Sequence, residues 1–206
     1  MVNVAGGRLA LTAQPASKNG FSYIAGTISS KGRRQVGPHG RLTTRQFLHP
    51  GYGVSVGVCL FGMNIDSVGW PAAGEIDATE IALSRPGSPF GSAHGPGYSG
   101  DSPISGTYSG PLSSLVGRWV THTLEWEPGV LRWAIDGAVY HEARATDPRA
   151  VGGWPFDAPF FVVLTMTVGS YLGGAIDTRT WPKGASGVKT ARAEFDFIRF
   201  EQLVDA

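Results

Sequence analysis

The chain has 206 residues, of which 42% are hydrophobic, and its 17 basic and 16 acidic residues leave a formal net charge of +1. A nearly neutral chain has no general electrostatic attraction to nucleic acid or to an anionic membrane, and no apolar run approaches the roughly 20 residues of a membrane-spanning helix. All-β folds of this length usually form one domain. We therefore expect a single domain over residues 1–206 that acts on a neutral partner.

Short runs rich in β-branched and aromatic residues follow one another along the chain, and several alternate apolar with polar residues. The pair Asp136-Gly137 between two of these runs is typical of a tight hairpin turn with positive φ. Helix-like pieces are short and lie at residues 111–115 and 147–151. So many short strands favour an antiparallel β-sandwich or jelly roll. The pattern predicts strands, in chain order, at residues 8–14, 24–30, 41–48, 54–61, 75–81, 122–127, 130–136, 138–143, 160–168 and 193–202.

Glycine, proline and cysteine content and the N-terminal segment give further information about turns, redox state and targeting. Thirty glycines and fourteen prolines lie between the apolar runs, which indicates tight turns rather than disorder. The single cysteine, Cys59, allows no internal disulfide, and we interpret it as a core residue because free cysteine is commonly buried. The opening "MVNVAGGRLALTAQ" lacks the basic and apolar regions of a signal peptide.

Two short motifs match catalytic or cofactor patterns in letters but not in context. "GVSVG" at residues 53–57 has the form of a hydrolase nucleophile elbow, which requires a strand-to-helix turn, yet the strand-like "VCLFG" follows it. "GPGYSG" at residues 95–100 has the spacing of a dinucleotide loop, but no helix can begin at the "DSPISG" that follows. We interpret the second motif as a loop that could touch a ligand. The five histidines have no metal-site spacing, so we expect no transition metal.

Three acids in one strand-like run, "GWPAAGEIDATEI", are the strongest chemical signal. In a regular strand Glu75 and Asp77 share one face, whereas Glu80 lies on the other. One extra residue, a β-bulge, would return Glu80 to the shared face. The Cα atoms of the two glutamates would then lie about 13 Å apart, at ~3.3 Å per residue. Side chains that lean together would bring the carboxyl groups roughly 5–6 Å apart, the separation used by retaining glycosidases.

Repulsion among three carboxylates should raise at least one pKa, which favours a catalytic role. The alternative is that the acids form a solvated strand face with no chemical role.

"WPAAGEIDATE" resembles the bulged E-x-D-x-x-E signature of glycoside hydrolase family 16, in the form found in laminarinase-like endo-β-1,3-glucanases. Other segments, including "HGPGYSG", "HTLEWEPGVLRWAIDGAVYH" and "AEFDFIRFEQ", are similar to family segments in the same order. The resemblance implies an antiparallel, concanavalin-like jelly roll with an open substrate cleft on its concave sheet. It also implies that Glu75 is the nucleophile, that Glu80 is the general acid and then base, and that Asp77 orients Glu75.

The resemblance implies substrate-binding residues as well. Trp70 matches the family tryptophan before the catalytic strand, and His94 matches the histidine that faces it; the alternatives are a packing tryptophan and a structural histidine. Tyr98 and Arg45 also match cleft positions of the family. Trp126 matches the family segment around "LEW", where the sequence leaves cleft and core equally open.

Two features depart from the family pattern. The family commonly has "WPAFW" where this chain has "SVGVC" at residues 55–59, so aromatic bulk expected near the cleft is missing. The chain also lacks the usual opening strand.

Asp196 matches a carboxylate ligand of the family's structural calcium site, and Gly7 matches a backbone ligand, so a structural Ca²⁺ is a further expectation.

The leading hypothesis is a monomeric, retaining endo-glucanase that cleaves β-1,3- or mixed β-1,3/1,4-glucan without a required cofactor. The alternatives are a β-galactan hydrolase or transglycosylase on the same scaffold, and a non-catalytic glycan-binding module. An extracellular or cell-surface location follows from where such polymers occur, although no signal peptide is present in this chain.

Overall fold

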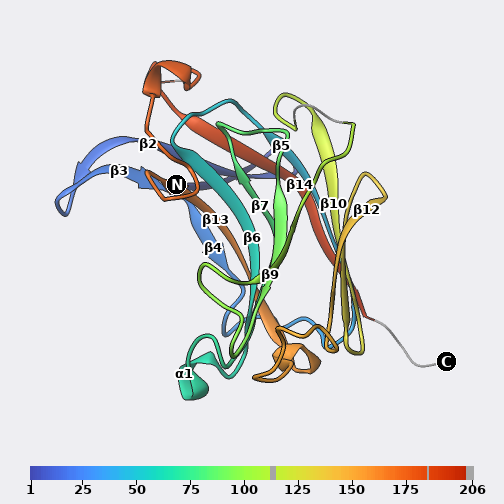
Figure 1. Ribbon diagram of the computed structural model, residues 1–206. Helices are drawn as coiled ribbons and strands as arrows, with labels where there is room; N and C mark the ends of the chain where they lie inside the picture. The colour runs from blue at the N-terminus through green and yellow to red at the C-terminus, as the bar shows by residue number, and fades with distance from the viewer. Residues whose placement is uncertain (112–114, 185, 203–206) are drawn as a thin grey trace.

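A computed structural model describes residues 1–111, 115–184 and 186–202, and it consists of two antiparallel sheets packed face to face (Figure 1). The larger sheet has the order β1-β2-β14-β5-β10-β11-β12, with β3 paired to β2. Its eight strands are β1 (Val2–Ala5), β2 (Arg8–Lys18), β3 (Phe21–Ala25), β5 (Gly40–Leu48), β10 (Trp119–Glu127), β11 (Val130–Ile135), β12 (Ala138–Arg144) and β14 (Ala191–Gln202).

The smaller sheet has the order β4-β13-β6-β7-β8-β9 and includes the run with the three acids, which forms β7. Its six strands are β4 (Thr27–Ser29), β6 (Val54–Gly62), β7 (Glu75–Ala82), β8 (Phe90–His94), β9 (Ile104–Thr107) and β13 (Phe160–Val168). The helical pieces are short: α1 (Ile65–Val68), η1 (Pro155–Asp157) and η2 (Thr178–Thr180). Within the described ranges, no helix is long and apolar enough to cross a membrane.

The hydrophobic core lies between the two sheets and follows from the alternation along each strand. In β10, Val120, His122, Leu124 and Trp126 are buried, while the alternate residues Thr121, Thr123 and Glu125 are partly exposed. In β6, Val56, Val58 and Leu60 belong to the same core. Alternate residues of a strand point to opposite faces, so each sheet has one buried face and one outer face. The outer face of the smaller sheet is therefore available for a site.

All ten predicted strands are present, and the fold class is confirmed. The Asp136-Gly137 turn is also confirmed, because both residues have positive φ, 46° and 84°. The predicted strand at 24–30 is divided at Gly26, where the chain passes from β3 in one sheet to β4 in the other. Residues 147–151 form turns rather than a helix, and the predicted piece at 111–115 lies partly outside the described residues.

Strands β1, β8 and β9 were not predicted. The sequences of β8 and β9, "FGSAH" and "ISGT", have little of the β-branched and aromatic content on which the prediction depends. They are strands because β7 supplies a pairing partner for β8, and β8 supplies one for β9.

Candidate active site

A β-bulge interrupts β7 at the position that the spacing of the acids predicts. Towards β6, Asp77 pairs with Cys59 and Thr79 with Val58, so Ala78 is an extra residue. Towards β8, the register also shifts between Asp77 and Glu80. The extra residue reverses the parity of the strand after Asp77, which places Glu80 on the outer face with Glu75 and Asp77. The predicted bulge is confirmed.

The three acids form the centre of three cross-strand rows on this outer face. Cross-strand partners share one face of a sheet, so each row brings its side chains together. The rows, from β6 through β7 to β8, are Phe61–Glu75–His94, Cys59–Asp77–Ser92 and Gly57–Glu80–Phe90.

Asp77 is the most buried of the three acids and is held by hydrogen bonds. Asp77 is only 2% exposed to solvent. The Ser92 hydroxyl donates to Asp77 Oδ2, and His94 Nε2 lies 3.1 Å from the same oxygen. Burial lowers the pKa of His94, but the hydrogen bond to Asp77 and the charges of the three acids raise it above its ordinary value overall. A protonated His94 donates to Asp77 and partly offsets the negative charge of the site.

The two glutamates are in environments that favour their neutral forms to different degrees. Burial and the charge of Asp77 raise the pKa of Glu75 to about 7, although His94 and a hydrogen bond from Trp70 act in the opposite direction. Burial and the charges of Asp77 and Glu75 raise the pKa of Glu80 to about 8. Glu75 therefore ionises before Glu80, which is the order that a nucleophile and a general acid require.

Trp70 lies beside Glu75, as the resemblance implied. Its indole Nε1 donates to Glu75 Oε2 at 2.7 Å, and its ring centroid lies 6.1 Å from that of His94. The residue is 47% exposed, so one part of the ring remains open to solvent. Trp70 is therefore not the buried packing residue of the alternative interpretation.

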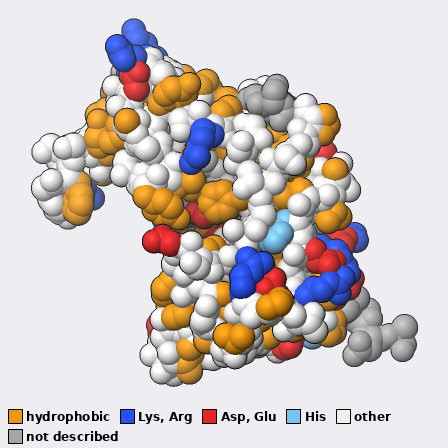
Figure 2. Space-filling view, in the orientation of Figure 1, with side chains coloured by type: hydrophobic (Ala, Val, Ile, Leu, Met, Phe, Trp, Pro, Cys, Tyr) orange, Lys and Arg blue, Asp and Glu red, His pale blue; other side chains and the backbone are white. Residues whose placement is uncertain are grey.

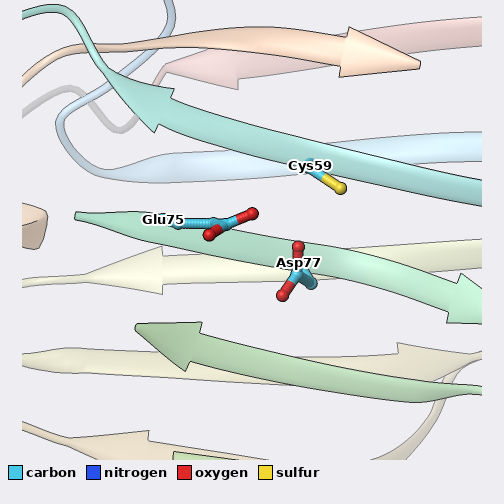
Figure 3. A group of neighbouring side chains, drawn as sticks. All are labelled: Cys59, Glu75 and Asp77. Carbon is cyan, nitrogen blue, oxygen red and sulfur yellow. The ribbon is translucent and has the colours of Figure 1, made fainter. Parts of the chain in front are cut away.

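Cys59 is buried, but it belongs to the floor of this site and not to the core between the sheets, which corrects its interpretation as a core residue. Figure 3 shows its sulfur on β6 beside the carboxyl groups of Glu75 and Asp77 on β7. Ligand atoms of these three residues lie within 4.8 Å of one another, the single grouping of this kind in the described part of the chain. Burial and the neighbouring acids raise the pKa of the Cys59 thiol. A thiol that keeps its proton is a poor metal ligand.

A pocket of about 240 Å³ opens above the acids. Figure 2 shows acidic side chains recessed among hydrophobic ones near the middle of the molecule. Tyr171 and Asp101 line the pocket but were missed by the sequence analysis. Tyr171 is 90% exposed in the loop after β13, and no strand pattern could place it. Gly100 also lines the pocket, and it belongs to the "GPGYSG" segment that was interpreted as a loop. The lining consists of Trp70, Glu75, Asp77, Glu80, His94, Gly100, Asp101 and Tyr171.

Three predicted substrate-binding residues lie elsewhere. Arg45 is on β5 in the larger sheet, where it pairs with Asp196 at 2.6 Å and lies over the ring of Trp119. Tyr98 is fully buried and donates its hydroxyl to the Gly153 carbonyl oxygen. Trp126 is 1% exposed, with its indole bound to the carbonyl of Phe156, so it belongs to the core. The cleft assignments of Arg45 and Tyr98 are wrong, because aromatic and cationic side chains also serve packing and ion pairing. For Trp126 the sequence left cleft and core open, and the structure places it in the core.

The predicted calcium ligands fit a cation poorly in this arrangement. The carboxylate of Asp196, the extra residue of a bulge in β14, lies 2.6 Å from the Arg45 guanidinium. Gly7 lies in the turn between β1 and β2. Ca²⁺ requires six to eight oxygen ligands, and an arginine already bound to the carboxylate competes with it.

Several named proteins are similar to nearly the whole of this chain, which spans 70–81% of their own length. No protein-family profile matches it. A β-glucanase of Rhodothermus marinus is 28% identical over 213 residues, covering 98% of this chain and 70% of that protein. The laminarinase catalytic domain of Thermotoga maritima superposes with a TM-score of 0.88 at 28% identity, covering 99% of this chain and 81% of that one.

A second solved structure gives the same result. An endo-β-1,3-glucanase of Pyrococcus furiosus superposes with a TM-score of 0.88 at 29% identity, covering 100% of this chain and 78% of that one. The relatives and the bulged strand with its three acids together indicate that the chain is a glycoside hydrolase, similar to the laminarinase-like enzymes of family 16.

Proposed function

We propose that the protein is a retaining, endo-acting hydrolase of β-1,3- or mixed β-1,3/1,4-glucan, with Glu75 as nucleophile and Glu80 as general acid and base. The observation that carries this proposal is the bulge at Ala78, which brings both glutamates into one pocket. The names of the relatives support the substrate class, because they include β-glucanases and endo-β-1,3-glucanases.

The first half of the reaction forms a covalent intermediate. The ionised carboxylate of Glu75 attacks the anomeric carbon, and the bond between this carbon and the glycosidic oxygen breaks. Glu80 gives its proton to that oxygen, so the leaving sugar departs as a neutral alcohol. Glu75 is then joined to the remaining sugar by an ester bond.

The second half of the reaction restores the enzyme. Glu80, now ionised, takes a proton from a water molecule, whose oxygen attacks the anomeric carbon from the side that the leaving group vacated. The ester bond to Glu75 breaks, and its carboxylate is released. Two displacements retain the anomeric configuration, and every step uses residues of the chain and water.

The neighbours of the glutamates provide orientation and charge. The Trp70 indole holds one oxygen of Glu75 and leaves the other free for attack. Asp77, fixed by Ser92 and His94, places a negative charge beside both glutamates, which contributes to the raised pKa values of both. The proton on Glu80 is thereby kept until the first displacement, after which Glu75 no longer carries charge and Glu80 ionises more easily.

The pocket supports binding of a sugar chain. The exposed rings of Trp70 and Tyr171 line it, and an aromatic face suits the C–H face of a pyranose. Along β6 the floor is made of Ser55, Gly57 and Cys59, which are small side chains. These small side chains leave space along the sheet beside the acids, as cleavage within a polymer requires.

The test is to incubate the protein with laminarin, lichenan and agarose and to measure new reducing ends. We expect products from laminarin or lichenan, with the β-anomer formed first in an NMR time course. Glu75→Gln should abolish turnover, while Glu125→Gln, which removes a carboxylate on the opposite sheet, should not. Product from agarose alone would favour a galactan hydrolase, transfer products would favour a transglycosylase, and binding without product would leave a glycan-binding module.

Three finer statements remain part of the proposal. We propose that the protein acts as a monomer, which size-exclusion chromatography tests. We also propose that it acts outside the cell, because β-glucans are polymers that do not enter cells, and cell fractionation tests this location. Calcium would bind at Asp196 only if Arg45 moved away. A rise in melting temperature with added Ca²⁺, reversed by EDTA, would support that site, and no change would contradict it.

A further inference from the structure

The main-chain carbonyl of Asp77, at the start of the bulge, is bound by a residue of the opposite sheet. Trp133 in β11 donates its indole Nε1–H to the Asp77 oxygen at 2.8 Å. In a regular strand a carbonyl points within its sheet, towards a neighbouring strand. A donor that comes across the core therefore shows that the bulge has turned this carbonyl inwards. A buried carbonyl without a partner costs free energy, so this bond stabilises the bulged conformation.

The surroundings of Trp133 hold its ring in one place. The side chain is fully buried, and His141 of β12 stacks on it with ring centroids 4.7 Å apart and an angle of 28° between the planes. On the other side, Gly91 of β8 leaves room for the ring, because a Cβ at this glycine would lie 2.2 Å from a ring carbon of Trp133. The indole therefore has little freedom to move away from the Asp77 carbonyl.

We propose that Trp133 is a positioning residue for Glu80, acting through the bulge of β7. Glu80 reaches the cleft face only because Ala78 is an extra residue in the strand. The Trp133 bond fixes the peptide immediately before this extra residue. Without the bond, the Asp77 carbonyl must find another partner, and the peptide from Asp77 to Glu80 turns with it. The carboxyl of Glu80 then moves relative to the glycosidic oxygen, whereas Glu75, which precedes the bulge, keeps its place. This inference rests on the proposed function.

The chain offers a matched control in Trp181. This tryptophan is 1% exposed and also donates its indole Nε1–H to a main-chain carbonyl, that of Tyr52, at 2.9 Å. It does not line the pocket. Trp133→Phe and Trp181→Phe therefore remove the same kind of bond from equally buried sites, and only the first affects the catalytic strand. Replacement of Trp133 by benzothienylalanine, which keeps both rings and loses only the N–H, is a second variant in case the phenylalanine protein does not fold.

The experiment compares two substrates that differ in their need for a general acid. We expect Trp133→Phe to lower kcat/KM for laminarin by about 10- to 100-fold, since a displacement of about 1 Å can cost this much. For a 2,4-dinitrophenyl β-laminaribioside, whose leaving group needs no proton, kcat/KM should change less than about threefold, because Glu75 keeps its position. Trp181→Phe should leave both values near those of the unmodified protein.

A second readout does not depend on turnover. NMR titration of ¹³C-labelled glutamate carboxyl groups should show a lower pKa for Glu80 in Trp133→Phe, because its carboxyl moves towards solvent, and no change in Trp181→Phe. Equal losses on both substrates, or a Glu80 titration identical to that of the unmodified protein, would overturn the inference. If the unmodified protein hydrolyses neither substrate, the proposed function fails, and the NMR comparison still decides whether Trp133 positions Glu80.

Discussion

Replacement of Glu80, the proposed general acid, should make the folded protein more stable while it abolishes the reaction. The pKa of Glu80 rises from 4.5, its ordinary value, to about 8 in the folded protein, first because of burial and then because of the charges of Asp77 and Glu75. The folded protein therefore holds a proton that the unfolded chain releases, and its free energy of unfolding decreases as pH rises from 4.5 to 8. Glu80→Gln removes this decrease, because an amide does not ionise.

The size of the effect follows from the two pKa values. Between pH 4 and pH 7 the shift from 4.5 to about 8 reduces the free energy of unfolding by about 3 kcal/mol. Glu80 is only partly buried, so solvent screening makes the reduction in the free energy of unfolding smaller than this value. We therefore expect the free energy of unfolding of Glu80→Gln to be about 1–3 kcal/mol higher than that of the unmodified protein at pH 7. At pH 4 the two free energies of unfolding should be nearly equal.

Urea unfolding at both pH values measures this difference. Glu142→Gln is a control of opposite sign, because hydrogen bonds from Arg132 and Arg144 lower the pKa of Glu142. That variant should lose stability at pH 7, and the loss should shrink as pH falls below 4.5. The reasoning about the site is refuted if Glu80→Gln is no more stable than the unmodified protein at pH 7, or if its advantage does not depend on pH.

Three further predictions concern the site and its surroundings. The value of kcat/KM should rise with pH as Glu75 ionises at about 7 and fall as Glu80 loses its proton at about 8, and a flat profile from pH 5 to 9 would contradict the assigned roles. Tyr171→Ala should raise KM for laminarin several-fold with little change in kcat, because its exposed ring lines the pocket as a binding surface; an unchanged KM would remove Tyr171 from the binding surface. Tyr98→Phe should lower the free energy of unfolding by about 1–2 kcal/mol, since the Gly153 carbonyl loses its donor, and should leave kcat/KM unchanged; a large loss of kcat/KM would return Tyr98 to the cleft.

The strands and the alignment of the three acids follow from local patterns in the sequence. Period-two alternation is a local property, so ten strands could be located without tertiary information. The parity argument for Glu75, Asp77 and Glu80 is local as well, because side chains alternate along any strand and only an extra residue can realign them. A bulge between Asp77 and Glu80 was therefore predictable from three residues, and the cross-strand register confirms it and places it at Ala78.

The aromatic and charged side chains that reach the site are selected by packing between distant segments of the chain. Alternation assigns a residue to one of two faces, but it does not say which face the other sheet covers. For Trp126 the sequence left cleft and core equally open, and the structure places it in the core at 1% exposure, whereas Trp70 is 47% exposed beside Glu75. Cys59 and Trp133 acquire their places through strand pairing and through packing across the core. Such contacts join residues far apart in the chain, and no local pattern contains them.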